Sequence, residues 1–253
     1  MTFLKSWLAP LLCAGFLGFS AGAWAQAPAP AAGASQDAND PVSIGVAAFN
    51  RGHWATAMRA WRPAAEQGNA MAQTNMGYLF EHGLGVQQSY VQAMEWYRKA
   101  AQQNQAQAQF NIGTLYLYGY GVERNTREAA GWFRQAARQN LPEGMYMLGM
   151  AYFEGVGVPN NPSLALEWLD RSARTGYSPA QMMLAQLHLS GDAGREEPFK
   201  AWVWSQVALN NGQKEAELIR DYASYRMRAA DVTRATEAAK LCIASAYQRC
   251  PPK

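Results

Sequence analysis

The sequence contains few of the residues on which several functions depend. Charged residues make up 16% of its 253 residues, the formal net charge is only +3, and there are three cysteines and three histidines. A net charge this close to zero argues against nucleic-acid binding, which draws its affinity from many phosphate contacts. Three cysteines cannot form a disulfide scaffold or, on their own, a four-ligand zinc site. With 49% hydrophobic residues, the chain is expected to fold around a packed core.

The first residues have the order of a secretory signal peptide. Lys5 precedes an apolar stretch that ends near Ala23-Trp24-Ala25. Residues 1–25 are therefore predicted to be a signal peptide, cleaved after Ala25, that exports the protein to the periplasm or out of the cell. The alternative is a retained membrane anchor. Pro10 interrupts the apolar run, however, and the run is shorter than the roughly 20 residues of a spanning helix.

Residues 26–43 are predicted to be a disordered tether. This segment is rich in proline and alanine, and up to Pro41 it has no aromatic residue and no aliphatic residue larger than alanine. Such a composition cannot bury enough apolar surface to offset the entropy lost on ordering.

A 36-residue period runs through the middle of the chain. Tryptophan recurs once per period, with alanine three positions earlier, and glycine recurs in the same way. The blocks are 70–105, 106–141, 142–177 and 178–213, with tryptophan at Trp96, Trp132, Trp168 and Trp204 and glycine at Gly83, Gly119, Gly155 and Gly191. Alanine and tryptophan three apart share one helix face, so we expect the tryptophans in the buried face of the second helix of each block.

Two further sets of small residues follow the same period. One set, Gly77, Gly113 and Gly149, is expected where two paired helices approach closely. The other consists of the residue types that best tolerate the left-handed conformation after a helix end: Gly68, Asn104, Asn140, Gly176 and Gly212. These positions predict five helix ends.

The pattern Ala-x-x-x-(Leu/Met/Ile)-Gly-x-x-(Tyr/Phe)-x-x-Gly-x-Gly-Val, followed by Ala-x-x-Trp, resembles the Sel1-like repeat, a relative of the tetratricopeptide repeat. Residues 44–69 resemble a shorter tetratricopeptide-like helix pair. The resemblance implies an exported bacterial member of that family with an all-α fold, a right-handed α-solenoid of stacked helix pairs. Block 178–213 departs from the pattern at its turn, where the valine is missing.

Residues 214–253 lack the period but have a helical pattern, and we interpret them as a C-terminal helical cap. Leu218, Ile219, Tyr222 and Tyr225 share one predicted helix face, and Asp231 is placed to cap a second helix.

Cys242 and Cys250 lie in this tail, and an oxidising compartment favours a disulfide between them. On one continuous helix their Cα atoms would be about 12 Å apart, too far for a bridge. A disulfide therefore predicts that the helix ends near Ser245. The alternative is two free thiols.

The sequence predicts neither an enzyme nor a bound cofactor or metal. No serine has lysine three residues later, which excludes the Ser-x-x-Lys motif of β-lactamases. The histidines are His53, His82 and His188, and none pairs with another at helical spacing for zinc. His188 occupies an aromatic position of the repeat and is expected to be structural. Eleven methionines could suggest copper capture, but packing explains them more simply.

In tetratricopeptide-like arrays the first helix of each pair usually lines the concave side, and the resemblance therefore assigns inward positions. The candidate partner-binding residues are Tyr78, Phe110, Thr114, Leu117, Tyr146, Met150, Phe153, Met182 and Gln186. The four first-helix segments, 70–83, 106–119, 142–155 and 178–191, contain no Lys or Arg. The predicted groove is therefore apolar to mildly acidic.

The leading hypothesis is an exported, non-enzymatic interaction module that binds an apolar segment of another protein in this groove. Its predicted partner is a periplasmic or envelope protein. The chain itself is expected to bind no nucleic acid and to have no membrane span after signal cleavage. The alternative is a cell-envelope factor that binds peptidoglycan or assists a cell-wall enzyme. Under a purely structural interpretation, the rings pack on neighbouring repeats or beneath the tail.

Overall fold

The computed structural model describes residues 40–251, so the predicted signal peptide and residues 26–39 of the predicted tether lie outside it. The described residues form twelve helices and no strand, which confirms the all-α prediction. In chain order they are α2 (Pro41–Asn50), α3 (Trp54–Glu66), α4 (Ala70–His82), α5 (Tyr90–Ala101), α6 (Ala106–Tyr118), α7 (Thr126–Arg138), α8 (Pro142–Glu154), α9 (Pro162–Ala173), α10 (Ser178–Ser190), α11 (Pro198–Asn210), α12 (Ala216–Tyr225) and α13 (Ala229–Ala244).

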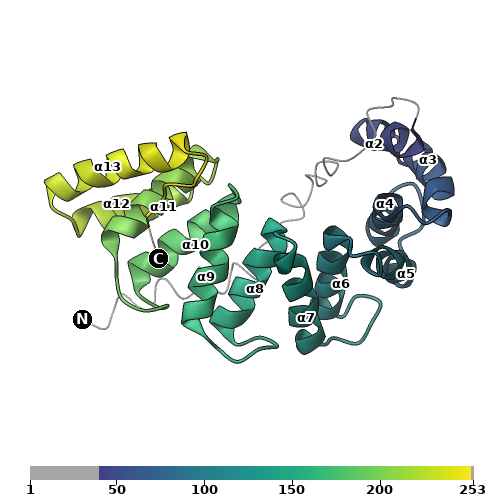
Figure 1. Ribbon diagram of the computed structural model, residues 1–253, viewed down its shortest axis with the longest axis horizontal. Helices are drawn as coiled ribbons and strands as arrows, with labels where there is room; N and C mark the ends of the chain where they lie inside the picture. Colours follow the sequence, from purple (N-terminus) through teal and green to yellow (C-terminus); the bar gives the residue numbers. More distant parts are fainter. Residues whose placement is uncertain (1–39, 252–253) are drawn as a thin grey trace.

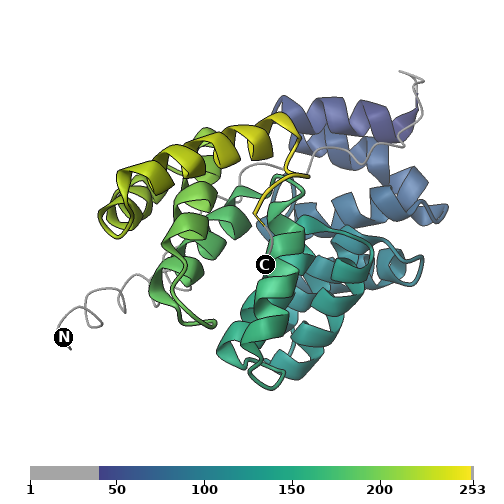
Figure 2. The same ribbon diagram turned by 60° about the vertical axis from the view of Figure 1, so that its left-hand side comes forward.

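The helices stack along an arc, with α2 and α3 at one end and α12 and α13 at the other (Figure 1). From α2 to α12, each helix packs against the next one in the chain, and α13 packs on α11. In the turned view, α13 lies on the green helices of the C-terminal end (Figure 2). Three successive apolar clusters fill the interior along the stack. This is the organisation of a solenoid, in which each helix pair buries its apolar face against its neighbours.

Side chains and glycines set the limits of the repeat helices. Asn69, Ser89, Asn125 and Asn161 each accept a hydrogen bond from a backbone N–H of the first helical turn that follows. At the other ends, Gly83, Gly119, Gly155 and Gly191 are left-handed C-caps. The five predicted helix ends are also left-handed, with φ from 61° to 97°. The prediction from the periodic glycines and asparagines is thus confirmed.

The tryptophans are not the residues that fill the repeat interior, contrary to the sequence-based expectation. Trp96, Trp132 and Trp168 are only half-buried, and among the four only Trp204 is fully buried. The residue after each of the first three, namely Tyr97, Phe133 or Leu169, is at most 2% exposed. One position along a helix is a rotation of about 100°, so the tryptophan lies at the edge of the buried stripe.

Two of the half-buried tryptophans, Trp96 and Trp168, instead stack with cations on the surface. The Lys99 ammonium lies 4.1 Å from the centre of the Trp96 ring, and the Arg171 guanidinium lies 4.3 Å from that of Trp168. Both bases belong to the same helix as the ring that they cover, three residues further on. These cations are therefore already paired with aromatic rings of their own helix.

Glycine allows the paired helices to approach closely, as predicted. A Cβ atom on Gly77 would come within 2.5 Å of the Tyr97 ring, and one on Gly113 within 2.7 Å of the Phe133 ring. In the first three repeats the glycine of the first helix thus accepts the large side chain of the second helix.

The second glycine of each turn joins consecutive repeats. Gly85, Gly121 and Gly157 have φ from 68° to 75°, and each packs against the start of the preceding second helix. A Cβ on Gly157 would overlap the carbonyl oxygen of Thr126 at the start of α7. No residue with a side chain fits there without moving backbone.

Buried amides also link neighbouring helices. The Gln73 side chain on α4 donates to the carbonyl of Ala65 on α3 at 3.0 Å and accepts from the Gln103 amide at 2.9 Å. Gln181 on α10 does the same with Ala173 and Asn211, at 3.0 and 2.8 Å. These glutamines were not among the residues predicted from the sequence to matter.

Two predictions at the ends of the array were wrong. The predicted tether extends to residue 43, but α2 begins at Pro41, because Asp40 caps it by accepting from the Ser43 N–H at 3.1 Å. Asp231 does not cap α13, which begins at Ala229. It lies in the first turn, where its carboxylate accepts from Arg228 at 3.0 Å.

Candidate functional site

The nine candidate groove residues divide into two groups. Six are partly exposed: Tyr78, Thr114, Tyr146, Phe153, Met182 and Gln186. The other three, Phe110, Leu117 and Met150, are at most 5% exposed. The assignment of these three as partner-binding residues was therefore wrong.

Packing between α6, α7 and α8 explains why those three are buried. The Phe110 ring centre lies 5.7 Å from that of Phe133 on α7. Leu117 and Met150 line the same small hollow as Phe133. Equivalent positions of two repeats can therefore differ, one being open to the groove and the other buried against the neighbouring helix. The difference arises because the side chains of that neighbouring helix are not the same in each repeat.

Tyr78 lies in an aromatic cluster near the N-terminal end. Its ring is stacked on His82 with centres 4.1 Å apart and meets Phe49 of α2 edge-on at 5.7 Å. Burial raises the pKa of the Tyr78 hydroxyl, and the nearby Glu81 carboxylate adds to the shift. Part of the Tyr78 ring thus packs on a neighbouring helix pair, and part remains accessible.

Glu81 is engaged inside the protein rather than free in the groove. Its carboxylate accepts a 2.6 Å hydrogen bond from the hydroxyl of the buried Tyr97. Burial raises the pKa of Glu81, while the Tyr97 hydroxyl and His82 act in the opposite direction. The acidic character of the predicted groove therefore rests mainly on Glu143 and Glu154.

Tyr146 and Tyr177 form a second aromatic pair, joining α8 to the start of α10. Their ring centres are 5.6 Å apart and the rings meet edge-on. Burial raises the pKa of Tyr146 to about 12, and the Glu154 carboxylate and Tyr118 contribute to the shift. Burial and the carboxylate of Glu143 raise the pKa of Tyr177 as well. Both hydroxyls therefore stay neutral at physiological pH and can act as hydrogen-bond donors.

The most accessible rings of this region were not among the residues predicted from the sequence. Tyr118 ends α6 and Tyr120 lies in the turn that follows, and their side chains are 40% and 43% exposed. The two rings are stacked at 5.5 Å, and Tyr120 also stacks on Tyr90 at 4.8 Å. Tyr118 is four residues after Thr114 and so shares its helix face. Extending the inward positions by one helical turn would have found it.

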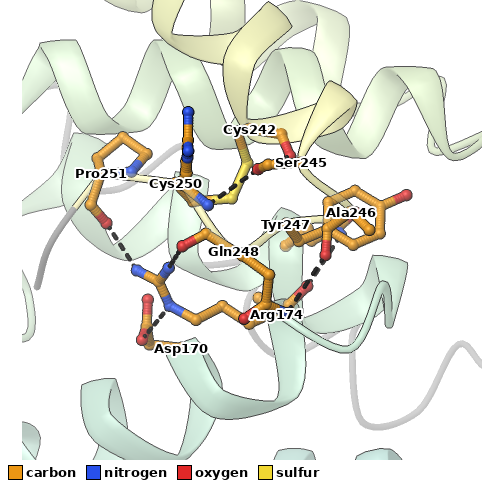
Figure 3. Close-up of a disulfide and its surroundings, with 12 residues drawn as sticks. Asp170, Arg174, Cys242, Ser245, Ala246, Tyr247, Gln248, Cys250 and Pro251 are labelled. Carbon is orange, nitrogen blue, oxygen red and sulfur yellow. Dashed lines mark hydrogen bonds and ion pairs between the residues drawn. A yellow bond between two sulfur atoms is a disulfide. The ribbon is translucent and has the colours of Figure 1, made fainter.

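The C-terminal tail folds back onto the end of the third repeat, near Asp170 and Arg174 (Figure 3), and onto Asn211 of the fourth. After α13 ends at Ala244, Ala246 and Tyr247 take positive φ of 48° and 66°, which reverses the chain. This places Cys242 and Cys250 side by side, with Cα atoms 4.4 Å apart and their sulfur atoms in disulfide contact. The predicted helix end near Ser245 is confirmed.

Arg174 holds this returning segment. Its guanidinium donates to the Asp170 carboxylate at 2.7 Å and to the carbonyls of Gln248 and Pro251 at 3.3 and 3.0 Å (Figure 3). The Tyr247 hydroxyl donates to the Asn211 side chain at 2.9 Å. The tail is thus fastened to α9 and to the end of α11.

No constellation for catalysis is evident among residues 40–251. His188 is buried and lies 3.2 Å from the Glu197 carboxylate, which also pairs with Lys200 at 3.0 Å. Burial lowers the pKa of His188, and Lys200 adds to this effect. In this part of the chain, no group of three or more His, Cys, Asp and Glu side chains could hold a metal ion. Nor is any of the described helices long and apolar enough to cross a membrane.

Comparison with known proteins identifies the repeat. The Sel1 repeat model matches residues 70–105, 106–141, 142–177 and 178–213. A Sel1 repeat protein from Oxalobacter formigenes is 32% identical over 71% of this chain and 74% of its own, with a TM-score of 0.64. No curated protein matches the chain significantly.

More distant solved structures share the fold. The protective antigen c5321 of uropathogenic Escherichia coli, described as displaying an SLR fold, is 24% identical over 83% of this chain and 59% of its own, with a TM-score of 0.50. The immunity protein Pa5087 of Pseudomonas aeruginosa is 16% identical over 82% and 84%, with a TM-score of 0.51. Four matched repeats cover more than half of the sequence, and the helices stack as a solenoid: the chain belongs to the Sel1 repeat family.

Proposed function

We propose that this protein is an exported docking module that binds an apolar segment of another protein on the tyrosine-lined face of α4, α6 and α8. Sel1 repeat proteins generally mediate protein–protein interactions and are typically non-enzymatic scaffolds. The proposed contact residues on or next to these helices are Tyr78, Thr114, Tyr118, Tyr120, Tyr146 and Phe153, and Met182 and Gln186 on α10 extend the face. The proposed site of action is the periplasm or cell envelope, which the predicted signal peptide supports.

The proposal rests on the exposure of Tyr118 and Tyr120. They lie at the end of α6, a helix that contains no Lys or Arg. Their rings are 40% and 43% exposed, and in the described structure neither ring has a Lys or Arg stacked on it. Aromatic rings that combine apolar area with a polar end are enriched in protein interfaces. This contrasts with Trp96 and Trp168, which are already covered by bases.

The packing of the tail also supports an open docking face. The extensive contacts of α12 and α13 are with α10 and α11, at the end of the array. The tail helices therefore leave the tyrosines of α4, α6 and α8 largely uncovered, although Tyr146 and Phe153 pack in part on the apolar cluster of the C-terminal repeats.

Site-specific photocrosslinking in the periplasm of the native host tests this function. A photoreactive amino acid at position 118 should give discrete protein adducts, whereas the same group at position 91, where Val91 on α5 is 58% exposed, should not. With the photoreactive group at position 153 instead, the double change Tyr118→Ala, Tyr120→Ala should lower adduct yield at least about tenfold, as loss of an aromatic anchor does. Equal yields at positions 118 and 91 would contradict the proposal.

The second candidate is a cell-envelope factor that binds peptidoglycan. The stacked Tyr90, Tyr120 and Tyr118 rings favour it, because such a row presents an accessible flat edge on which sugars could stack. Purified protein that pellets with washed sacculi, and no longer does so after Tyr118→Ala and Tyr120→Ala, would support this alternative over protein docking.

We also infer that Cys242 and Cys250 are oxidised in the exported protein. Thiol titration of the denatured mature protein should find no free thiol before reduction and two afterwards. Closing so short a loop should add about 2–3 kcal/mol to the free energy of unfolding. The double variant Cys242→Ser, Cys250→Ser should lose this stability and become insensitive to reductant. Two titratable thiols in the unreduced protein would show that the bond does not form.

A further inference from the structure

Helix α12 has one face that packs on the array and one that is exposed to solvent. It packs on α11 through Ala216 and Ala223, both fully buried, with Ile219 partly buried beside them. Of the four residues predicted to share one face of this helix, the other three point to solvent. Leu218 is 76% exposed, Tyr222 39% and Tyr225 89%, and the Arg226 guanidinium lies over the Tyr222 ring, 5.6 Å from its centre. Spacings of four and three residues place these three side chains along one stripe.

The position of this stripe makes it unusual. The terminal units of a solenoid ordinarily present a polar outer face, since no further repeat covers them. Here three of the eight large apolar side chains that are exposed in residues 40–251 lie on one ten-residue helix at the C-terminal end of the arc (Figure 1). A cluster of this kind indicates an interaction surface.

The charges around α12 indicate which partner fits it. Glu215 and Glu217 lie at its start, while Arg226 and Arg228 follow its end. Within the chain Glu217 pairs with Arg220 at 3.1 Å, Arg226 with Glu196 at 2.7 Å and Arg228 with Asp231 at 3.0 Å. The Arg228 side chain is still 86% exposed, and exposed ion pairs of this kind are weak. In the middle, Arg220 and Asp221 pair with each other at 2.8 Å, and Lys214 precedes the acids. If a second α12 helix packs antiparallel to the first, the acidic start of each helix lies beside the basic end of the other. A parallel arrangement would place like charges together.

We propose that the Leu218–Tyr222–Tyr225 stripe is a self-association face, on which α12 of a second copy of this chain packs antiparallel. Near the two-fold axis, Tyr222 meets its equivalent. On either side, Leu218 of one copy lies against Tyr225 of the other, and Glu215 lies near Arg228. Such a contact is isologous and closed, so it yields a dimer and not a filament.

The size of the contact sets its strength. One pair of ten-residue helices buries less than the roughly 1,600 Å² of a standard stable interface. The dimer is therefore weak and depends on concentration. It is also independent of the docking face on α4, α6 and α8, so either proposal can fail without the other.

Sedimentation velocity of the purified protein over about 1 µM to about 500 µM tests the proposal, a range that brackets weak dimers. The mass should rise from monomer towards dimer. Leu218→Glu should abolish the rise, whereas Val91→Glu, which alters an exposed valine on α5, should leave it unchanged. Circular dichroism checks that both variants are folded. A monomer at every concentration, or a dimer unaffected by Leu218→Glu, would overturn the proposal.

Charge reversal tests the orientation separately. Glu215→Arg alone should weaken the dimer at least about tenfold, because the introduced arginine then faces Arg228 of the other copy in both symmetric contacts. Arg228→Glu alone should weaken it for the converse reason. An equimolar mixture of these two variants should regain dimer. In each homodimer, both contacts between positions 215 and 228 join like charges. In the mixed dimer, one contact joins the two introduced charges and the other joins the two original charges, and both pairs are of opposite sign. If the mixture stays monomeric while the unchanged protein dimerises, the antiparallel pairing is wrong.

Discussion

Replacing Phe133 with alanine is expected to lower the free energy of unfolding by about 3–5 kcal/mol, the range for removing a fully buried aromatic ring. Phe133 is 2% exposed and packs against both Phe110 and the Gly113 surface of α6. Neither the helix backbone at Gly113 nor the ring of Phe110 can close the space that the change leaves. Urea unfolding followed by circular dichroism measures the effect.

The matched control is the neighbouring tryptophan. Trp132 is larger than Phe133 and follows the periodic pattern, yet it is only half-buried. Trp132→Ala should therefore cost about 1–2 kcal/mol, less than the smaller ring beside it. If Trp132→Ala proved the more damaging of the two, the buried stripe of the second helices would be centred on the tryptophan, as the spacing alone suggests.

The change Gly157→Ala should lower the free energy of unfolding by about 2–5 kcal/mol, because two costs add together. A non-glycine residue at its φ of 75° is strained by about 1–2 kcal/mol. The new methyl group would also overlap the Thr126 carbonyl oxygen, and such overpacking costs about 1–3 kcal/mol. Since Thr126 begins α7 of the preceding repeat, the damage should weaken the joint between two repeats.

Two other glycine-to-alanine changes separate these costs. Gly155 has φ of 74°, but the nearest atom to an added Cβ is 3.4 Å away, so Gly155→Ala should show the conformational strain alone. Gly131 lies within α7 with nothing within 4 Å, and Gly131→Ala should stabilise the protein by about 1 kcal/mol. Thermal and urea unfolding of the three variants should give the order Gly131, Gly155, Gly157 from most to least stable. Equal losses at Gly155 and Gly157 would mean that the turn does not press on α7.

The sequence alone was sufficient for the repeat and for the ends of its helices. Residues such as Asn104 and Gly176 mark left-handed positions that follow from backbone sterics, and these need no knowledge of neighbours. The same holds for the break of α13 near Ser245, which follows from the reach of two cysteines eight residues apart. Local geometry fixes these features, so a local pattern is enough to find them.

The accessibility of a side chain required the tertiary structure. Leu117 and Phe153 occupy equivalent positions of successive repeats, yet the first is buried and the second is partly exposed. Leu218 and Tyr225 have the spacing of a buried face, yet α12 packs through its alanines and leaves both in solvent. Periodicity determines which residues share a face of a helix. What lies against that face depends on the side chains, lengths and angles of helices distant in the sequence, and only the assembled stack decides it.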